Sequence, residues 1–153
     1  MAKTIRPTDD TKEARMKTHV NLRKAFSLIN KSMKDEIYIA AYVTAFSVIE
    51  DRVFAIYVVA KRVETGIIEI KKNPKETFKS YVDYLKDEKV ITKLVAEKLL
   101  SEADTRNKLL HGAMWRLDEF TKRTTERAVN LAKEMNALRT AQRKIHGIGY
   151  KVD

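Results

Sequence analysis

The segment from Tyr38 to Val63 is apolar on more than one side, and this limits the folds open to the chain. Its large apolar side chains recur at spacings that cover most of a helical circumference, whereas a surface helix shows one apolar stripe. We therefore expect a helix over about residues 34–63 that is enclosed by the rest of the chain. The longest apolar run, Ile37 to Ile49, ends at three charged residues and is too short for an uninterrupted membrane span, so it is expected to be a buried helix and no membrane-spanning segment is expected.

The composition indicates that other helices enclose this core helix. The chain has 153 residues, a single-domain length, and its four glycines and two prolines are too few for the many turns of an all-β protein. The fold class is therefore expected to be all-α. We expect one helical domain over residues 11–146, an N-terminal tail over residues 1–10 and a C-terminal tail over residues 147–153.

Two further helices are expected toward the ends of the chain. The first runs over about residues 11–33 and has a basic outer side. The last begins near Trp115 or Arg116 and extends to about Lys144. Its apolar stripe is long, and the C-terminal half of that stripe has few obvious partners in so short a chain, which favours a homodimer. The first stripe comprises Leu22, Phe26, Ile29 and Met33, and the last comprises Leu117, Thr124, Ala128, Leu131, Met135, Leu138 and Ile145.

The middle of the chain contains shorter helical patterns. One apolar face begins at Phe78 and ends at Leu85, and a second pattern runs from Ile91 to Leu99. Residues 101–104 have the form of a capping box, which predicts that a new helix begins near Glu102. The segment Ile67–Ile70 could be a strand, an extended loop or a helical turn.

The formal net charge of +10 favours a polyanionic partner, nucleic acid or acidic lipid, although solubility is the simpler explanation. The excess lies at the two ends: residues 1–34 carry nine Lys and Arg against three acids, and residues 116–153 carry nine against five. The absence of cysteine removes disulfides, thiol catalysis and Cys-ligated zinc. It is compatible with a reducing cytoplasm, and no signal peptide is visible, so a cytoplasmic location is expected.

Residues 104–112 hold the polar cluster that is best suited to chemistry. Asn107 and His111 are four residues apart and share a face of a helix, and Asp104, seven residues before His111, joins them. Arg106 is five residues before His111, about 140° around an ideal helix, so these two side chains point in different directions. They converge if Arg106 sits in a first helical turn and wraps over a groove, or if a dimer brings two sets together across a two-fold axis.

The residue types of this cluster suit the cleavage of RNA without a metal. An imidazole can accept the proton of a ribose 2′-hydroxyl near neutral pH, and a guanidinium can hold the phosphate oxygens as charge builds on them. Asn107 would orient His111 or donate to the phosphate, and Gly112 would let a nucleotide come close. His19, His111 and His146 lack the spacing of a helical metal motif, so neither a metal nor another cofactor is expected.

Two acidic residues, Glu50 and Asp51, interrupt the apolar helix. A carboxylate that points inward from such a helix needs a partner, because burying an unpaired charge is costly. Glu50 or Asp51 could pair with Arg52 or with a surface lysine. Alternatively, one of them faces the polar cluster at residues 104–111 and supports it.

Residues 106–112 read Arg-Asn-Lys-Leu-Leu-His-Gly, which resembles the Arg-Asn-x-x-x-His signature of the HEPN superfamily (higher eukaryotes and prokaryotes nucleotide-binding domain). The apolar segment that ends in Ser-Val-Ile-Glu-Asp-Arg at residues 47–52 resembles the family's helix with an inward acidic or polar residue. The similarity covers about Tyr38 to Leu138. It implies an up-and-down bundle of four to five main helices with the signature at the start of a late helix. It also implies a homodimer in which two Arg–His sets form one cleft.

Many members of that family are metal-independent endoribonucleases of toxin–antitoxin or abortive-infection systems, often encoded beside a nucleotidyltransferase antitoxin. The resemblance therefore implies that this chain cleaves RNA as a toxin or antiphage effector and has an antitoxin partner. It implies Arg106 and His111 as catalytic residues and Asn107 as their support. Supporting acids are expected among Glu50, Asp51 and Asp104, and RNA contacts are expected from Lys108, Arg116, Arg123 and Arg127.

Two other functions remain open. One is a non-catalytic helical module that binds nucleic acid or a partner protein through its basic first and last helices. The other is a helical interaction protein in which Arg106 and His111 are buried against Glu50 or Asp51 with no open groove. In the non-catalytic binding module, the phosphate contacts would come from Arg15, Arg23, Lys24, Arg123, Arg127, Arg139 and Arg143.

Overall fold

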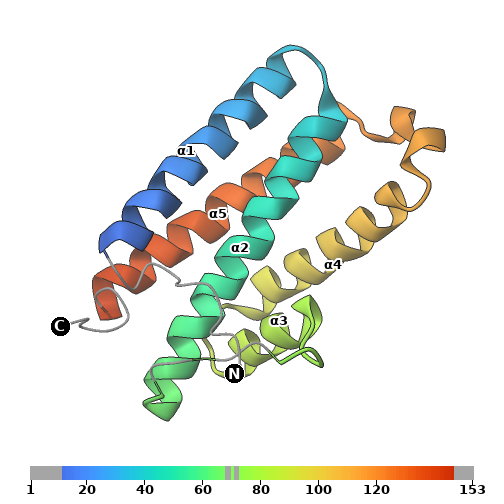
Figure 1. The fold of residues 1–153 in the computed structure, drawn as a ribbon. Helices are drawn as coiled ribbons and strands as arrows, with labels where there is room; N and C mark the ends of the chain where they lie inside the picture. Colours follow the sequence, from blue (N-terminus) through green and yellow to red (C-terminus); the bar gives the residue numbers. More distant parts are fainter. Residues whose placement is uncertain (1–11, 68–69, 71–72, 147–153) are drawn as a thin grey trace.

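In the computed structural model, which describes residues 12–67, 70 and 73–146, the central element is helix α2 (Tyr38–Thr65). Helices α1 (Lys12–Lys34) and α5 (Lys122–His146) pack along it, and α3 (Phe78–Asp87) packs toward its C-terminal end (Figure 1). Helix α4 (Lys93–Leu110) contacts α3 and α5. Two 3-10 turns, η1 (Ala113–Trp115) and η2 (Leu117–Glu119), connect α4 to α5.

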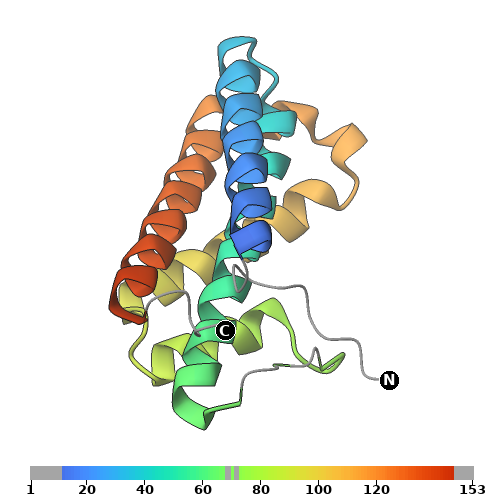
Figure 2. The same cartoon turned by 60° about the vertical axis from the view of Figure 1, so that its left-hand side comes forward.

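The four long helices α1, α2, α4 and α5 run alternately up and down, and the short α3 lies between α2 and α4 in the sequence (Figures 1 and 2). The described residues contain no strand. The prediction of an all-α bundle of four to five main helices is therefore confirmed. None of the described helices combines the length and the apolar content that crossing a membrane requires. The predicted tails at 1–10 and 147–153, and part of the unclassified segment Ile67–Ile70, lie outside the described residues.

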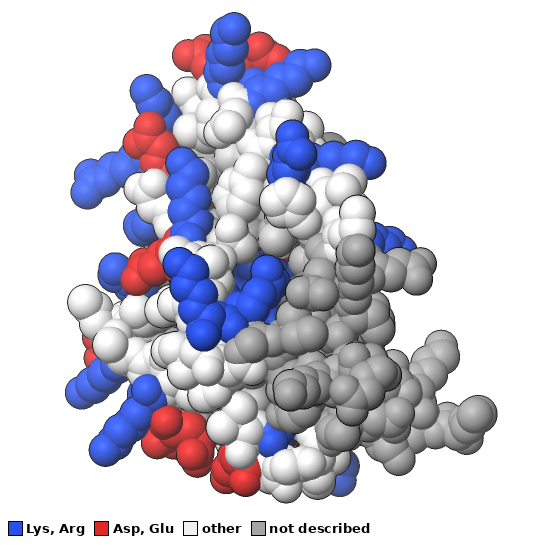
Figure 3. Space-filling view, turned by 90° about the vertical axis from the view of Figure 1, so that its left-hand side faces the viewer, with Lys and Arg blue, Asp and Glu red and all other residues white. Residues whose placement is uncertain are grey.

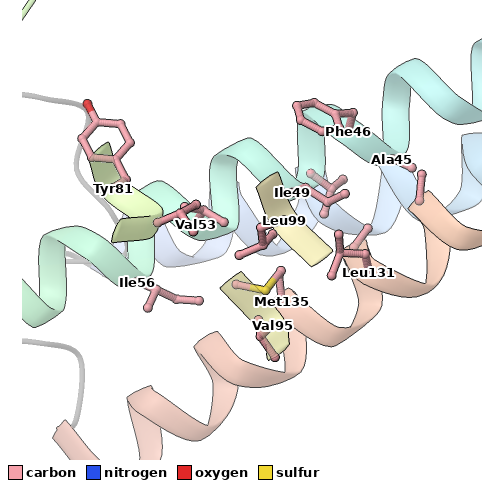
Figure 4. Packing of buried hydrophobic residues seen from close by; sticks show 14 of the residues in the cluster. Ala45, Phe46, Ile49, Val53, Ile56, Tyr81, Val95, Leu99, Leu131 and Met135 are labelled. Carbon is pink, nitrogen blue, oxygen red and sulfur yellow. The ribbon is translucent and has the colours of Figure 1, made fainter. Parts of the chain in front are cut away.

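The core of the bundle forms around α2, as the sequence predicts. Five consecutive residues of this helix, 55–59, are buried, so every side of it is covered there. In Figure 4, Ile49 and Val53 of α2 lie close to Leu99 of α4 and Met135 of α5. Leu99 and Met135 are fully buried. Burial of one such side chain contributes about 1.5–3 kcal/mol, so this layer stabilises the bundle.

Helix α1 has the two predicted sides. Ile29 is fully buried, and Leu22, Phe26 and Met33 pack half-buried against the core. The outer side is basic and exposed, with Lys17, Arg23, Lys24 and Lys31.

Local hydrogen bonds determine where several helices begin and end. The Thr77 hydroxyl accepts the Ser80 N–H at 3.2 Å and the Ser80 hydroxyl accepts the Thr77 N–H at 2.8 Å, which forms a capping box at the start of α3. The Thr92 side chain accepts an N–H of the first turn of α4 at 3.2 Å. Gly66 ends α2 with φ +70°, a conformation that glycine adopts without a steric cost.

The predicted helix start near Glu102 is wrong. Helix α4 continues through Ser101 without a break, and the Ser101 carbonyl accepts the Thr105 hydroxyl at 3.1 Å. The inward-facing positions of α4 continue at helical spacing past Ser101. Their packing against the bundle outweighs a short capping pattern. Residues 106–111 therefore form the last turn and C-cap of α4 instead of the first turn of a new helix. The inward positions are Val95, Leu99, Glu102, Arg106 and Leu109.

The predicted start of the last helix, near Trp115 or Arg116, is also wrong. Gly112 has φ +74° and turns the chain out of α4, and the two 3-10 turns follow. Helix α5 begins only after Thr121, whose hydroxyl accepts the Thr124 N–H at 3.1 Å as a helix cap.

The C-terminal half of α5 has partners within the chain. Met135 is fully buried, and Gln142 donates from Nε2 to the carbonyl of Ile56 in α2 at 3.0 Å. Only the ends of the predicted stripe, Leu117 and Ile145, are exposed. The stripe of α5 therefore does not support a homodimer. The homodimer stays a prediction from the resemblance to the HEPN superfamily and from the helical positions of Arg106 and His111.

Candidate functional site

Arg106 projects from the last turn of α4 toward α2. Its Nη1 donates to Glu50 Oε1 at 3.0 Å, and its guanidinium carbon lies 4.5 Å from the centre of the Phe46 ring. Phe46 is buried, whereas the Arg106 and Glu50 side chains keep 27% and 47% of their surface exposed. The guanidinium is thus held from two directions and still reaches the surface.

The two acidic residues of α2, Glu50 and Asp51, have different partners, and each partner is one of those expected from the sequence. Glu50 faces the cluster on α4 through Arg106. Asp51 instead binds its neighbour Arg52, whose Nε and Nη2 donate to Asp51 Oδ2 at 3.0 and 2.6 Å. Arg52 is buried, so this pair satisfies a charge that α2 carries into the bundle.

His111 is the C-cap residue of α4 and is exposed. Its N–H donates to the Asn107 carbonyl at 3.1 Å, and its φ of −73° is helical, so its Cβ leaves the helix on the side of Asn107 as predicted. Its ψ of 102° then takes the chain out of the helix toward Gly112. Asn107 and Asp104 are exposed as well.

Arg106 and His111 therefore leave α4 in different directions. Arg106 faces α2, while His111 lies about 140° further around the helix, on the exposed side. Since these residues close a helix, the first-turn arrangement that would let Arg106 wrap toward His111 does not exist. The closed arrangement, in which both side chains are buried against α2, does not exist either, because His111 is exposed.

A polar contact that was not expected from the sequence lies one turn earlier on α4. Glu102 is buried, accepts the Tyr42 hydroxyl at 2.8 Å and accepts Arg127 Nε at 3.1 Å. Burial, followed by the hydrogen bond and the charge of Glu102, raises the pKa of Tyr42 above its ordinary value. Glu102 falls on the inward stripe of α4 between Leu99 and Arg106, so the helical spacing marks it as an inward-facing residue but does not identify Tyr42 as its partner.

Glu102→Ala should lower the free energy of unfolding by about 2–3 kcal/mol, because it leaves the fully buried Tyr42 hydroxyl without its acceptor. Arg127→Ala should cost about 1 kcal/mol or less, because the Arg127 side chain is 59% exposed and water can replace its bond to Glu102. Urea unfolding of both variants, with Glu102→Gln as the conservative control, measures the difference. An Arg127→Ala variant as destabilised as Glu102→Ala would contradict this assignment.

The basic residues predicted to contact RNA have different neighbours. Lys108 is exposed in the last turn of α4. In the connection to α5, Arg116 Nη1 lies 3.7 Å from Glu119 Oε2. Arg123 and Arg127 instead line a groove of about 610 Å³ between α4 and α5, together with glutamates of both helices. Arg139, predicted to contact phosphate in the binding-module hypothesis, is buried, so that part of the prediction is wrong. The glutamates in the groove are Glu97, Glu102, Glu126 and Glu134.

Within the described residues, no group of three or more His, Asp or Glu side chains is arranged to hold a metal ion. No protein-family model matches the chain, and neither the curated proteins nor the solved structures contain a match.

Proposed function

We propose that this protein is a metal-independent endoribonuclease of the HEPN type, with Arg106 and His111 as its catalytic residues. The observation that carries the proposal is the guanidinium of Arg106, held at the surface by Glu50 and Phe46 five residues before an exposed histidine. A positioned cation and an accessible imidazole are the two groups that RNA cleavage through the 2′-hydroxyl requires. The net charge of +10 is suited to an RNA substrate.

In the proposed reaction, the ribose 2′-oxygen attacks the adjacent phosphorus. His111 takes the 2′-hydroxyl proton, the bond between the 2′-oxygen and phosphorus forms, and the bond between phosphorus and the 5′-oxygen breaks. The departing 5′-oxygen takes a proton from solvent. Arg106 stabilises the charge on the non-bridging oxygens, and Glu50 is a positioning residue that holds the guanidinium. The products are a 2′,3′-cyclic phosphate and a 5′-hydroxyl.

The directions of Arg106 and His111 on α4 bear on the assembly that this reaction needs. Since the two side chains leave the helix about 140° apart, one copy does not present both to the same phosphate by helical geometry. Two copies whose α4 C-termini meet across a two-fold axis would combine Arg106 of one with His111 of the other. A homodimer is therefore part of the proposal, as is a role as a toxin or antiphage effector with an antitoxin partner.

Cleavage of a labelled single-stranded RNA in excess EDTA tests the proposed function. We expect the rate to be unchanged by the chelator, because both reacting groups are side chains. Loss of cleavage in EDTA, restored by added Mg²⁺ or Zn²⁺, would show that a metal supplies the chemistry and would refute the mechanism.

A second candidate function is nucleic-acid binding without cleavage, and the basic side of α1 favours it. Lys and Arg side chains are spread over the face in Figure 3, with acidic side chains in fewer places. A cavity of about 500 Å³ between α1 and α5 is lined by side chains that include His19, Arg23 and Arg143. This function predicts tight, salt-dependent binding with no turnover.

A further inference from the structure

The connection between α4 and α5 carries a conspicuously exposed aromatic side chain. Trp115 is 81% exposed, and it is the single tryptophan of the chain. Met114 and Leu117 beside it are also more than half exposed. The connection lies at one end of the bundle, outside the layer of helices around α2 (Figure 1). A face this apolar and this exposed in a short segment indicates a contact with another molecule.

The backbone of this connection places the indole next to the candidate site. Gly112 follows His111 with φ +74°, and its carbonyl accepts the Trp115 N–H at 2.9 Å in the turn η1. The indole comes close to this glycine: a Cβ placed on Gly112 would lie 4.0 Å from Trp115 Cδ1. Trp115 is thus held beside the residue that directly follows the proposed general base.

We infer that Trp115 is a stacking platform for an unpaired base of the bound RNA. This inference rests on the proposed function. An exposed indole face offers a base the sequence-tolerant stacking that proteins use to hold single strands. The bases of a duplex are stacked on one another and do not present their faces to a side chain.

The charges around Trp115 are suited to a nucleic acid. Lys108 and Arg116 are exposed and flank the segment 109–115 in the sequence, and such cations suit the phosphates of a bound strand. The apolar side chains are interrupted by Arg116 and followed by Asp118 and Glu119, so they do not continue as the apolar stripe that a helix–helix interface needs.

The single tryptophan provides the test. Tryptophan emission is titrated with a single-stranded 2′-O-methyl oligonucleotide, which binds as RNA does but has no 2′-hydroxyl to attack. We expect saturable quenching, and much weaker quenching with the same sequence in a duplex. By fluorescence anisotropy with a labelled oligonucleotide, Trp115→Ala should weaken binding about 5- to 100-fold, and Trp115→Phe should retain part of it. Ile145→Ala, which removes another exposed apolar side chain at the far end of α5, should bind like the wild type.

Two results would overturn the inference. One is oligonucleotide binding that neither quenches the emission nor weakens in Trp115→Ala. The other is equal quenching by the single-stranded oligonucleotide and by the same sequence in a duplex. The catalytic proposal fails separately: quenching together with cleavage that is unaffected by His111→Ala would leave Trp115 as a binding residue and remove His111 as the base.

Discussion

His111→Ala should lower the rate of RNA cleavage by about 10²- to 10⁴-fold, the contribution typical of a positioned general base. The histidine is exposed at the C-cap of α4, and its structural bond to Asn107 comes from its backbone, which the substitution keeps. We therefore expect the free energy of unfolding to change by less than about 0.5 kcal/mol. Single-turnover cleavage of a labelled single-stranded RNA, with saturating protein, measures the chemical step.

The chain offers matched controls for this substitution. His19 and His146 are also exposed, on α1 and at the end of α5. His19→Ala and His146→Ala should cleave at the wild-type rate, since neither residue lies in the last turn of α4. A rate for His111→Ala within a few-fold of these controls would remove the histidine from the mechanism.

Arg106→Ala should lower the cleavage rate by about 10²- to 10³-fold, because the guanidinium stabilises charge that develops on the phosphate in the transition state. Arg106→Lys keeps the positive charge but loses the two-pronged donor and the contact of the guanidinium with the Phe46 ring, so most of the loss should remain. Binding of the uncleavable oligonucleotide should change much less than the rate, since the contact strengthens mainly in the transition state.

The same substitutions distinguish a catalytic role for Arg106 from a structural one. Its ion pair with Glu50 is partly exposed and should contribute about 0–1 kcal/mol to stability. Arg106→Ala should therefore unfold at nearly the wild-type urea concentration. If it loses stability and oligonucleotide binding in proportion to its loss of cleavage, Arg106 only supports the fold.

The sequence predicted the helices whose apolar pattern is long and periodic. Helix α2 was identified because its apolar residues exceed one stripe, and α1 because one stripe faces a basic side. The errors fall at the two ends of the candidate segment. A capping pattern at Ser101 predicted a helix start within α4, and the stripe of the last helix was extended back to Leu117 across two 3-10 turns. Both errors arise because short local patterns do not show which residues the rest of the bundle will bury.

The sequence identifies the residues of the candidate site but not the tertiary contacts that their side chains make. The pairing of Glu50 with the segment 104–111 was among the expected alternatives, because a carboxylate on an enclosed helix needs a partner. Spacing alone also placed Asn107, and not Arg106, on the side of His111. The tertiary contacts of Arg106 with Phe46 and of Glu102 with Tyr42 depend on the distance between α2 and α4, which no spacing within either helix reveals.

The ends of the RNA products test the central claim most directly. After cleavage of a defined single-stranded RNA by the wild-type protein in EDTA, the ends are identified by mass spectrometry. The proposed attack by the 2′-hydroxyl predicts a 2′,3′-cyclic phosphate on the upstream fragment and a 5′-hydroxyl on the downstream fragment. Fragments that carry a 5′-phosphate and a 3′-hydroxyl, or an RNA that stays intact while bound, would contradict the assignment of Arg106 and His111 as a ribonuclease site.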